Sequence, residues 1–254
     1  RGVPRREGGL KNKKNNPNQN KSQLTKEKPH HPPPKKTIVG DPLAMVDFER
    51  LAGRCSQAGL DTAGLLRQRG QRDAELTRMA GAARVQLTTT DGKTLWGSFW
   101  EGRAGAPGIA LIPMAGNSRH IWRPWATQLS NDGWWVLALD ARGQGLSIGP
   151  GLEMQVTPDD GLAALSFLSE RVGRTAPVAI MGASYGGAIA LFAASEAAGR
   201  VKAVVLLSPA GARAKERTLA AVSRCRWHTL LITSIDDGAF TEWNLEMYDH
   251  APRG

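Results

Sequence analysis

Hydrophobic and polar residues alternate in two ways along the chain, and each pattern predicts a type of element. Residues 83–100, ARVQLTTTDGKTLWGSFW, alternate with a period of two on both sides of Asp91-Gly92, which predicts two strands joined in a hairpin. From Gly108 onward, short aliphatic runs alternate with segments of helical spacing. The predicted strands are GIALIP, WWVLALD, VAIM, VKAVVLLS and TLLITS. The predicted helices lie at residues 122–129, 158–172 (with Thr157 as its N-cap), 186–198, 216–222 and 241–248.

This order of elements predicts an α/β fold with a mostly parallel sheet and helices on both faces, because a crossover between parallel strands needs a helix-length segment. We place this domain at residues 82–254. Ligands of open α/β sheets bind outside the carboxyl ends of the strands. Site residues are therefore expected in the segments that follow the strands.

Residues 41–81 predict a helical N-terminal extension before the hairpin. Leu, Ala and Arg recur there at roughly helical spacing. Gly59 and Gly70 are expected to interrupt the pattern, which gives two or three short helices. The pattern assigns no function to this extension.

Residues 1–40 have the composition of a disordered basic tail. They hold 11 Lys or Arg and 2 Asp or Glu, whereas the rest of the chain holds 22 and 21, so +9 of the formal charge of +10 comes from the tail. Almost no aromatic or β-branched residues are present to bury a core. The charge alone would suit RNA, DNA or an anionic membrane surface. A solvated tail without a specific nucleic-acid partner is favoured, since no aromatic residues are interleaved with the charges.

Other features of the composition indicate a cytoplasmic protein. Cys55 and Cys225 lie far apart, in neither metal-binding nor redox spacing. No charged start followed by an apolar region marks a secretory signal. We predict no metal, no cofactor and no membrane span. The glycines in particular lack the spacing of nucleotide-binding loops. The oligomeric state is not indicated.

Residues 178–194, VAIMGASYGGAIALFAA, contain no charged residue and allow two interpretations. A membrane helix is disfavoured, because the run of 17 residues is short for a span and glycines dilute its middle. A strand, a tight turn and an Ala-rich helix explain the G-x-S-x-G pattern of Gly182–Gly186 better, since glycines make room around a nucleophile on a strained turn. The positive end of the following helix would stabilise an oxyanion near Ser184.

Three motifs, in this order, resemble those of the α/β-hydrolase superfamily. DARGQGLS at residues 140–147 resembles its D-x-R-G-x-G-x-S loop, GASYGG resembles its nucleophile elbow, and SIDD at residues 234–237 resembles the position of its catalytic acid. The resemblance covers residues 82–254 and is to small serine esterases and dienelactone-hydrolase-like proteins. It implies an α/β-hydrolase fold and hydrolysis of carboxylic esters or lactones of small molecules, without a cofactor.

The resemblance also implies the members of a catalytic triad. Ser184 is expected to be the nucleophile that forms an acyl-enzyme, after a histidine has taken its proton. Asp237 is expected to orient that histidine. Asp236 is a close competitor by spacing, and one of the two carboxylates can instead cap the following turn.

The oxyanion hole and the substrate pocket are expected on either side of the nucleophile. Backbone N–H groups of Tyr185 and of Ala115 or Met114 are the expected donors to the oxyanion. Pro113-Met114 stands where the family usually has His-Gly, so this loop departs from the family pattern. His120 and Trp122 follow this loop and are candidates for lining the substrate pocket. The alternatives are that His120 is solvated and that Trp122 is a packing residue.

Asp140 and Arg142 are interpreted as structural. We expect them to pair and brace a tight glycine loop. About twenty residues separate Ser208 from Thr229, where lidded relatives insert a helical cap. An open site, suited to small soluble esters, is therefore expected.

The catalytic histidine is the weak point of the resemblance, because the family places it one strand beyond the acid. His250 lies at the wrong end of its predicted helix, and His228 precedes its strand. We therefore expect the base beyond Gly254, in a longer protein of which this chain lacks the last strand and helix, so that this fragment is of low activity. The alternatives are a non-catalytic hydrolase-fold binding protein, or an acyltransferase, thioesterase or peptidase at the same site.

Overall fold

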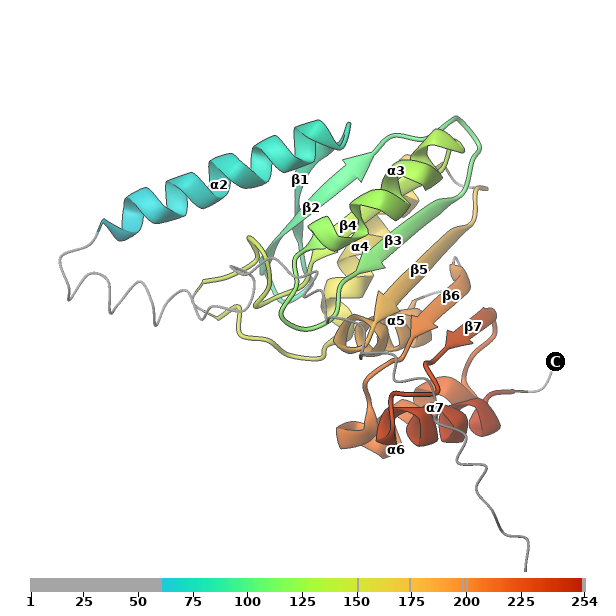
Figure 1. The fold of residues 1–254 in the computed structure, drawn as a ribbon. Helices are drawn as coiled ribbons and strands as arrows, with labels where there is room; N and C mark the ends of the chain where they lie inside the picture. The colour runs from blue at the N-terminus through green and yellow to red at the C-terminus, as the bar shows by residue number, and fades with distance from the viewer. Residues whose placement is uncertain (1–60, 150, 174, 198, 200, 253–254) are drawn as a thin grey trace, which may run out of the picture. The chain divides into compact units, whose positions relative to one another are not determined.

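The computed structural model describes residues 61–149, 151–173, 175–197, 199 and 201–252. The predicted basic tail lies outside these residues, as does the first part of the predicted helical extension. A seven-stranded sheet forms the centre of the described part (Figure 1). Its strands are β1 (Ala83–Thr88), β2 (Thr94–Trp100), β3 (Gly108–Ile112), β4 (Trp135–Asp140), β5 (Val178–Ala183), β6 (Val201–Leu207) and β7 (His228–Ile232).

The strands lie in the order β1-β2-β4-β3-β5-β6-β7. The pairs β1–β2 and β2–β4 are antiparallel, and all pairs from β4 to β7 are parallel. The first pair is the predicted hairpin, with Gly92 in the left-handed region at its turn. The mostly parallel sheet is thereby confirmed, and the carboxyl ends of β3, β4, β5, β6 and β7 share one edge.

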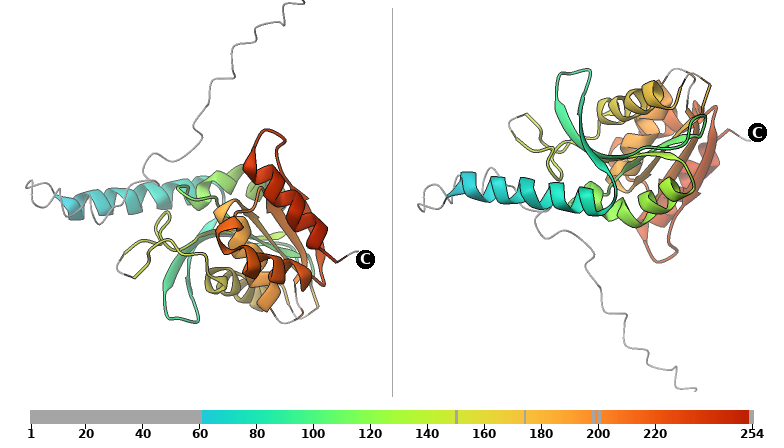
Figure 2. Two further views of the ribbon diagram at one scale, coloured as in Figure 1. Left: turned by 90° about the horizontal axis from the view of Figure 1, so that it is seen from below. Right: turned by 90° about the horizontal axis from the view of Figure 1, so that it is seen from above.

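Helices lie on both faces of this sheet (Figure 2). They are α2 (Thr62–Met79), η1 (Arg119–Trp122), α3 (Arg123–Asn131), α4 (Pro158–Arg171), α5 (Tyr185–Glu196), η2 (Ala212–Ala214), α6 (Lys215–Ser223) and α7 (Ala239–His250). Thr157 is the N-cap of α4, as predicted, because its hydroxyl accepts the N–H of Asp159 at 3.3 Å.

The core consists of two apolar clusters, one on each face of the sheet. The larger cluster joins one face to α4, α5, α6 and α7, with Ile180, Leu168 and Ile189 fully buried. The smaller cluster joins the other face to η1 and α3 through Trp122 and Ala126. Alternate residues of the parallel strands enter the two clusters, which explains why these strands are continuous hydrophobic runs in the sequence.

One expectation about the segment before the hairpin is wrong. α2 is continuous from Thr62 to Met79 and passes through Gly70 without a break. A glycine inside a helix costs only about 1 kcal/mol relative to alanine, so contacts elsewhere on α2 are sufficient to carry the helix through it. The predicted break at Gly59 lies outside the described residues.

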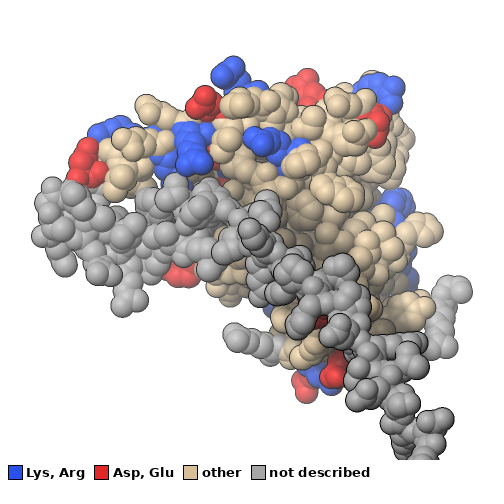
Figure 3. Space-filling view, in the orientation of Figure 1, with Lys and Arg blue, Asp and Glu red and all other residues tan. Residues whose placement is uncertain are grey.

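On the face shown in Figure 3, charged side chains of both signs are scattered, with more Lys and Arg than Asp and Glu over α2. In the part of the chain that the structure describes, we find no helix that combines the length and the apolar character needed to cross a membrane.

Candidate active site

Ser184 lies on a sharp turn between β5 and α5, at the carboxyl edge of the sheet. Its φ of 47° and ψ of −113° place this non-glycine residue in a strained backbone conformation. The turn is fixed by the backbone: the Ser184 N–H donates to Leu207 O at 2.8 Å, and Ser184 O accepts from Ala210 N–H at 2.9 Å. The half-buried Ser184 side chain makes no hydrogen bond to the described residues. Its hydroxyl is therefore available to a ligand.

The glycines around Ser184 are required by close approach. A Cβ on Gly182 would overlap the carbonyl group of Gly186, and a Cβ on Gly186 would overlap the carbonyl oxygens of Ile112 and Pro113. The second contact shows that the loop after β3 lies directly against the first turn of α5. The sequence pattern thus has a steric cause in this fold.

The segments expected to supply an oxyanion hole meet at this turn. Tyr185 is the first residue of α5, where backbone N–H groups have no partner within the helix. Met114 and Ala115 follow β3 and are exposed. The loop is held from the other side, since Gln144 Nε2 donates to Met114 O at 2.8 Å. Whether these N–H groups receive an oxyanion stays a prediction.

The Tyr185 side chain points away from the expected chemistry. It is buried, and its hydroxyl donates to Gln155 O at 2.8 Å. Burial, reinforced by the nearby Asp160 carboxylate, raises the pKa of the Tyr185 phenol above its usual range. The side chain is consequently a neutral anchor for α5.

Asp237 follows β7 and is exposed, and its carboxylate accepts a hydrogen bond from the loop after β6. Ser208 Oγ donates to Asp237 Oδ2 at 2.6 Å. Neither Asp236 nor Asp237 caps α7 with its side chain, because the N-cap residue is Gly238. The carboxylate of Asp237 is the one tied to the loop that touches Ser184.

The expected pairing of Asp140 with Arg142 is wrong. Asp140 is fully buried and forms an ion pair with Arg119, whose backbone N–H also donates to Asp140 Oδ1 at 2.6 Å. Leu146 N–H donates to Asp140 Oδ2 at 2.9 Å. Residue 145 must be glycine here, because a Cβ on it would overlap the Asp140 carboxylate. Asp140 thus holds the loop after β4 against the segment after β3.

Arg142 is also buried, but it binds two other carboxylates. Its Nε donates to Asp160 Oδ1 at 2.8 Å, and its Nη1 to Asp91 Oδ2 at 3.0 Å. Burial raises the pKa of Asp160 even though Arg142 opposes the shift. For Asp91, the hydrogen bonds from Arg142 lead the causes that lower its pKa. Arg142 therefore joins α4 to the hairpin, which agrees with a structural role.

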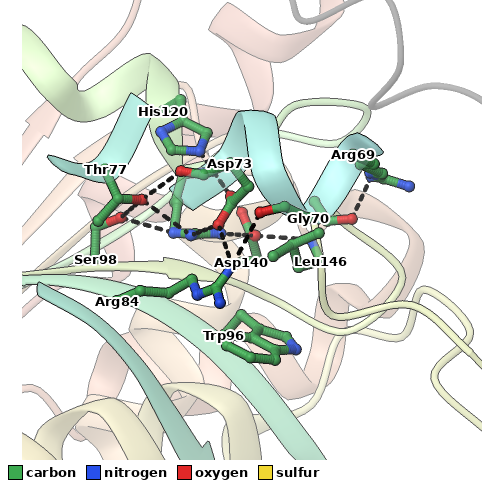
Figure 4. A network of polar contacts seen from close by, with 12 residues as sticks. Arg69, Gly70, Asp73, Thr77, Arg84, Trp96, Ser98, His120, Asp140 and Leu146 are labelled. Atoms are coloured by element: carbon green, nitrogen blue, oxygen red, sulfur yellow. Dashed lines mark hydrogen bonds and ion pairs between the residues drawn. The ribbon is translucent and has the colours of Figure 1, made fainter. Parts of the chain in front are cut away.

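Sequence reasoning missed Arg119, whose guanidinium is the centre of a buried polar network. Its partners Asp73, Ser98 and Asp140 are labelled in Figure 4. Arg119 Nη2 donates to Asp73 Oδ2 at 2.7 Å, and Arg119 Nε donates to Ser98 Oγ at 2.8 Å. Burial opposes the charge of Arg119, but Asp140 and Asp73 outweigh it and raise its pKa. The network anchors α2 to the sheet. Only the polar character of Asp73 and Thr77 within α2 could have signalled it.

The two residues expected to line the substrate pocket have different surroundings. His120 is half-buried, and its Nε2 lies 2.8 Å from Asp73 Oδ1. It is therefore neither a solvated residue nor bonded to Ser184. Trp122 is buried in the smaller apolar cluster, as expected of a packing residue. A role for either in contacting substrate stays a prediction.

The other described histidines lie away from the elbow. His228 begins β7 and so is at the amino edge of the sheet. His250 ends α7, and its Nδ1 lies 2.8 Å from Glu246 O. Among the described residues, no three His, Cys, Asp or Glu side chains converge as metal ligands would.

A comparison of the sequence with models of protein families assigns the chain to a family. The family model described as serine aminopeptidase, S33, matches residues 112–246, more than half of the chain. The chain belongs to this family of α/β hydrolases. The matched region runs from the end of β3 into α7, so it includes Ser184 and Asp237.

Solved structures of hydrolases share the fold. The chain is 20% identical to the Pyrococcus furiosus esterase Pf2001, with a TM-score of 0.55, over 66% of this chain and 77% of the esterase. It is 25% identical to a dienelactone hydrolase from Anabaena variabilis, with a TM-score of 0.52, over 67% and 81% of the two chains. A predicted CIB-like hydrolase from Thermoplasma acidophilum gives 18% identity and a TM-score of 0.51, over 67% and 83%.

A search of curated protein sequences gives no match. The family assignment and the shared fold establish this S33-family chain as a hydrolase of the α/β type.

Proposed function

We propose that this hydrolase cleaves carboxylic esters or lactones of small molecules through an acyl-enzyme on Ser184. The observation that carries the proposal is the strained turn of Ser184 at the carboxyl edge of a parallel sheet, where its hydroxyl has no hydrogen-bond partner among the described residues. Strain of this kind is kept where a side chain must be held for chemistry. The dienelactone hydrolase fold match, at 25% identity, supports small esters or lactones as the substrate class.

The proposed reaction has two steps. Ser184 Oγ attacks the carbonyl carbon while a histidine takes its proton, and the alcohol leaves with that proton as the acyl-enzyme forms. Water then attacks the acyl-enzyme while the same histidine accepts its proton, and the histidine returns that proton to Ser184 Oγ as the acid leaves. N–H groups of Tyr185 and of Ala115 or Met114 stabilise the oxyanion in both steps. Asp237 orients the histidine and stabilises its charged form.

The histidine of this proposal lies outside the described residues. Among the described histidines, His120 binds Asp73, His228 lies at the amino end of β7, and His250 lies at the end of α7. The proposal therefore assigns the base to a residue that the structure does not describe.

The preference for small substrates rests on the segment between β6 and β7. Only η2 and α6 lie between Leu207 and His228. Met114, Ala115 and Asp237 are exposed at the same edge. An uncovered site offers little apolar surface to a long acyl chain, so short esters are favoured.

Peptide hydrolysis is the second candidate, and the description of the matched family as serine aminopeptidase favours it. The nucleophile and oxyanion hole of an esterase also serve an amide substrate. The two candidates differ in the substrate that is turned over, not in the residues that act.

The test compares p-nitrophenyl acetate, butyrate and palmitate with an aminoacyl p-nitroanilide, using the full-length wild-type protein and its Ser184→Ala and Ser223→Ala variants. Ser223 ends α6 on the surface and is the matched control. We expect acetate and butyrate to be cleaved fastest, and Ser184→Ala to lower the rate by about 10³-fold or more. Equal rates for the wild type and Ser184→Ala would contradict the proposal. Faster cleavage of the anilide would favour the peptidase.

A further inference from the structure

The Asp237 carboxylate is held through one of its two oxygens. Ser208 Oγ donates to Asp237 Oδ2 at 2.6 Å, whereas Asp237 Oδ1 makes no hydrogen bond with the described residues. Because Asp237 is exposed, water competes for both oxygens, and a single contact there would fix the side chain weakly. The carboxylate therefore keeps one orientation only if Ser208 is itself held.

Ser208 is held through both its backbone and its side chain. Its N–H donates to Ile232 O at 2.7 Å, which ties the residue to the end of β7. Its Oγ lies 3.5 Å from the Oγ1 of Thr233, the half-buried residue that follows β7. The hydroxyl of Ser208 thus lies between Asp237 on one side and Thr233 on the other.

Thr233 is bound in turn by a buried residue of α7. Asn244 Nδ2 donates to Thr233 Oγ1 at 3.0 Å. Asn244 is fully buried beside Trp243, and its Oδ1 has no partner among the described residues. An unpaired buried acceptor costs free energy that an apolar side chain would not. The hydrogen bond from Nδ2 is accordingly the contact that explains an asparagine on the buried face of α7.

The hydrogen bonds of this chain run in one direction, toward the carboxylate. Ser208 donates its only hydroxyl proton to Asp237, so it is the acceptor in its contact with Thr233. Thr233 therefore donates to Ser208 and accepts from Asn244. Hydrogen bonds aligned in this way strengthen one another. At 3.5 Å the contact between the two hydroxyls is the longest of the three, so Thr233 contributes less than Ser208 does.

Asp236 has no such support. Its backbone N–H donates to Ser234 Oγ at 3.3 Å, but its carboxylate makes no hydrogen bond or ion pair with the described residues. Of the two neighbouring carboxylates, only that of Asp237 is connected to the core through a chain of polar side chains. One of its oxygens remains available to an N–H donor.

We propose that Ser208, supported by Thr233 and Asn244, is a positioning residue for Asp237, the acid of the triad. The inference rests on the proposed function, in which Asp237 orients a histidine. Ser208 holds Oδ2, which leaves Oδ1 for the histidine N–H. It acts through Asp237 and takes no proton from the nucleophile or the substrate.

The test measures the second-order rate constant with which a fluorophosphonate labels Ser184 in the full-length protein. This rate reports the activation of the serine whichever substrate the enzyme prefers. We expect labelling to be about tenfold slower in Ser208→Ala and about threefold slower in Thr233→Val. Thr233→Ser keeps the hydroxyl, so it should label within about twofold of the wild type. Thr127→Val, in α3, is the matched control and should also label like the wild type.

A double-mutant cycle separates positioning from general support of the fold. Asp237→Ala should label at least about 10²-fold more slowly than the wild type. Adding Ser208→Ala to it should change the rate by less than about twofold, because the group through which Ser208 acts is gone. A further loss of about tenfold in that background would indicate a merely structural role and would overturn the proposal.

The outcomes also separate this inference from the proposed function. Labelling that depends on Ser184 and Asp237 but is unchanged in Ser208→Ala overturns the positioning role alone. Labelling that is lost in Asp236→Asn and retained in Asp237→Ala overturns it as well, since Asp236 would then be the acid. Failure of Ser184 to label in the wild type overturns the proposed function, and this inference with it.

Discussion

Ser208 Oγ lies 2.6 Å from Asp237 Oδ2, so the residue after β6 holds the carboxylate that follows β7. Ser208 has a φ of 40°, which is unusual for a residue with a side chain. Two residues later, Ala210 N–H binds Ser184 O at 2.9 Å. One strained loop therefore contacts both the proposed nucleophile and the proposed acid.

This loop gives the first prediction. Ser208→Ala removes the hydroxyl but keeps the left-handed backbone strain, whereas Ser208→Gly removes both. We expect Ser208→Gly to be more stable than Ser208→Ala by about 1 kcal/mol, because glycine adopts positive φ without a steric penalty. Urea unfolding of the two variants measures the difference. An alanine variant as stable as the glycine variant would show that the backbone there is unstrained.

The elbow gives the second prediction. Gly186→Ala places a methyl group against the carbonyl oxygens of Ile112 and Pro113, which are backbone atoms and cannot turn aside. We expect a loss of about 3 kcal/mol in the free energy of unfolding. Chemical denaturation measures it, and a loss below about 1 kcal/mol would mean that the loop after β3 does not press against α5.

Gly70→Ala is the third prediction and has the opposite sign. No atom lies within 4 Å of a Cβ placed on Gly70, and the residue is inside α2. Alanine should stabilise the protein by about 1 kcal/mol through its higher helix propensity. A rise in Tm of a few degrees is the expected readout. A fall would indicate that α2 bends or ends at this glycine.

The elements that could be predicted from the sequence are those determined by neighbouring residues. Asp91-Gly92 and Thr157 mark a turn and a helix start through their own backbone chemistry, so their positions follow from sequence alone. The strand, turn and helix around Ser184 do so as well. Gly70 misled the prediction because a weak local preference was overridden by the anchoring of α2 through Asp73.

Distant partners were beyond the sequence pattern. Arg119 pairs with Asp140, 21 residues later, and with Asp73, 46 residues earlier. An arginine near a predicted helix start is ordinarily a surface residue. The D-x-R-G-x-G-x-S motif suggested an ion pair between Asp140 and Arg142. In the structure Asp140 binds Arg119 instead, and Arg142 binds Asp160 and Asp91. Such a choice depends on which elements pack together.

The buried network gives the fourth prediction, for Asp73→Asn. Burial alone would raise the pKa of Asp73, but hydrogen bonding to His120 and the charge of Arg119 outweigh it and hold the pKa below 3.8. The stabilisation from ionised Asp73 is therefore complete above pH 3.8 and is lost as the pH falls through the lower folded-state value. Breaking this buried pair should cost about 3 kcal/mol near neutral pH.

Denaturation of the wild type and Asp73→Asn at several pH values tests this. The difference in the free energy of unfolding between the two proteins should become smaller as the pH falls below 3.8. Asp249→Asn, an exposed carboxylate near the end of α7, is the control and should change stability little at any pH. A difference that widens in acid would contradict the low pKa of Asp73.

The most direct test of the account is labelling of the purified full-length protein, in which the catalytic histidine is expected, by a fluorophosphonate probe, because such probes form a covalent bond with an activated serine. The wild type is compared with Ser184→Ala and Ser223→Ala by mass spectrometry of the labelled peptide. The account predicts one label, on Ser184, in the wild type and in Ser223→Ala, and none in Ser184→Ala. Labelling that persists in Ser184→Ala, or its absence from the wild type, would contradict the role of Ser184 as the nucleophile.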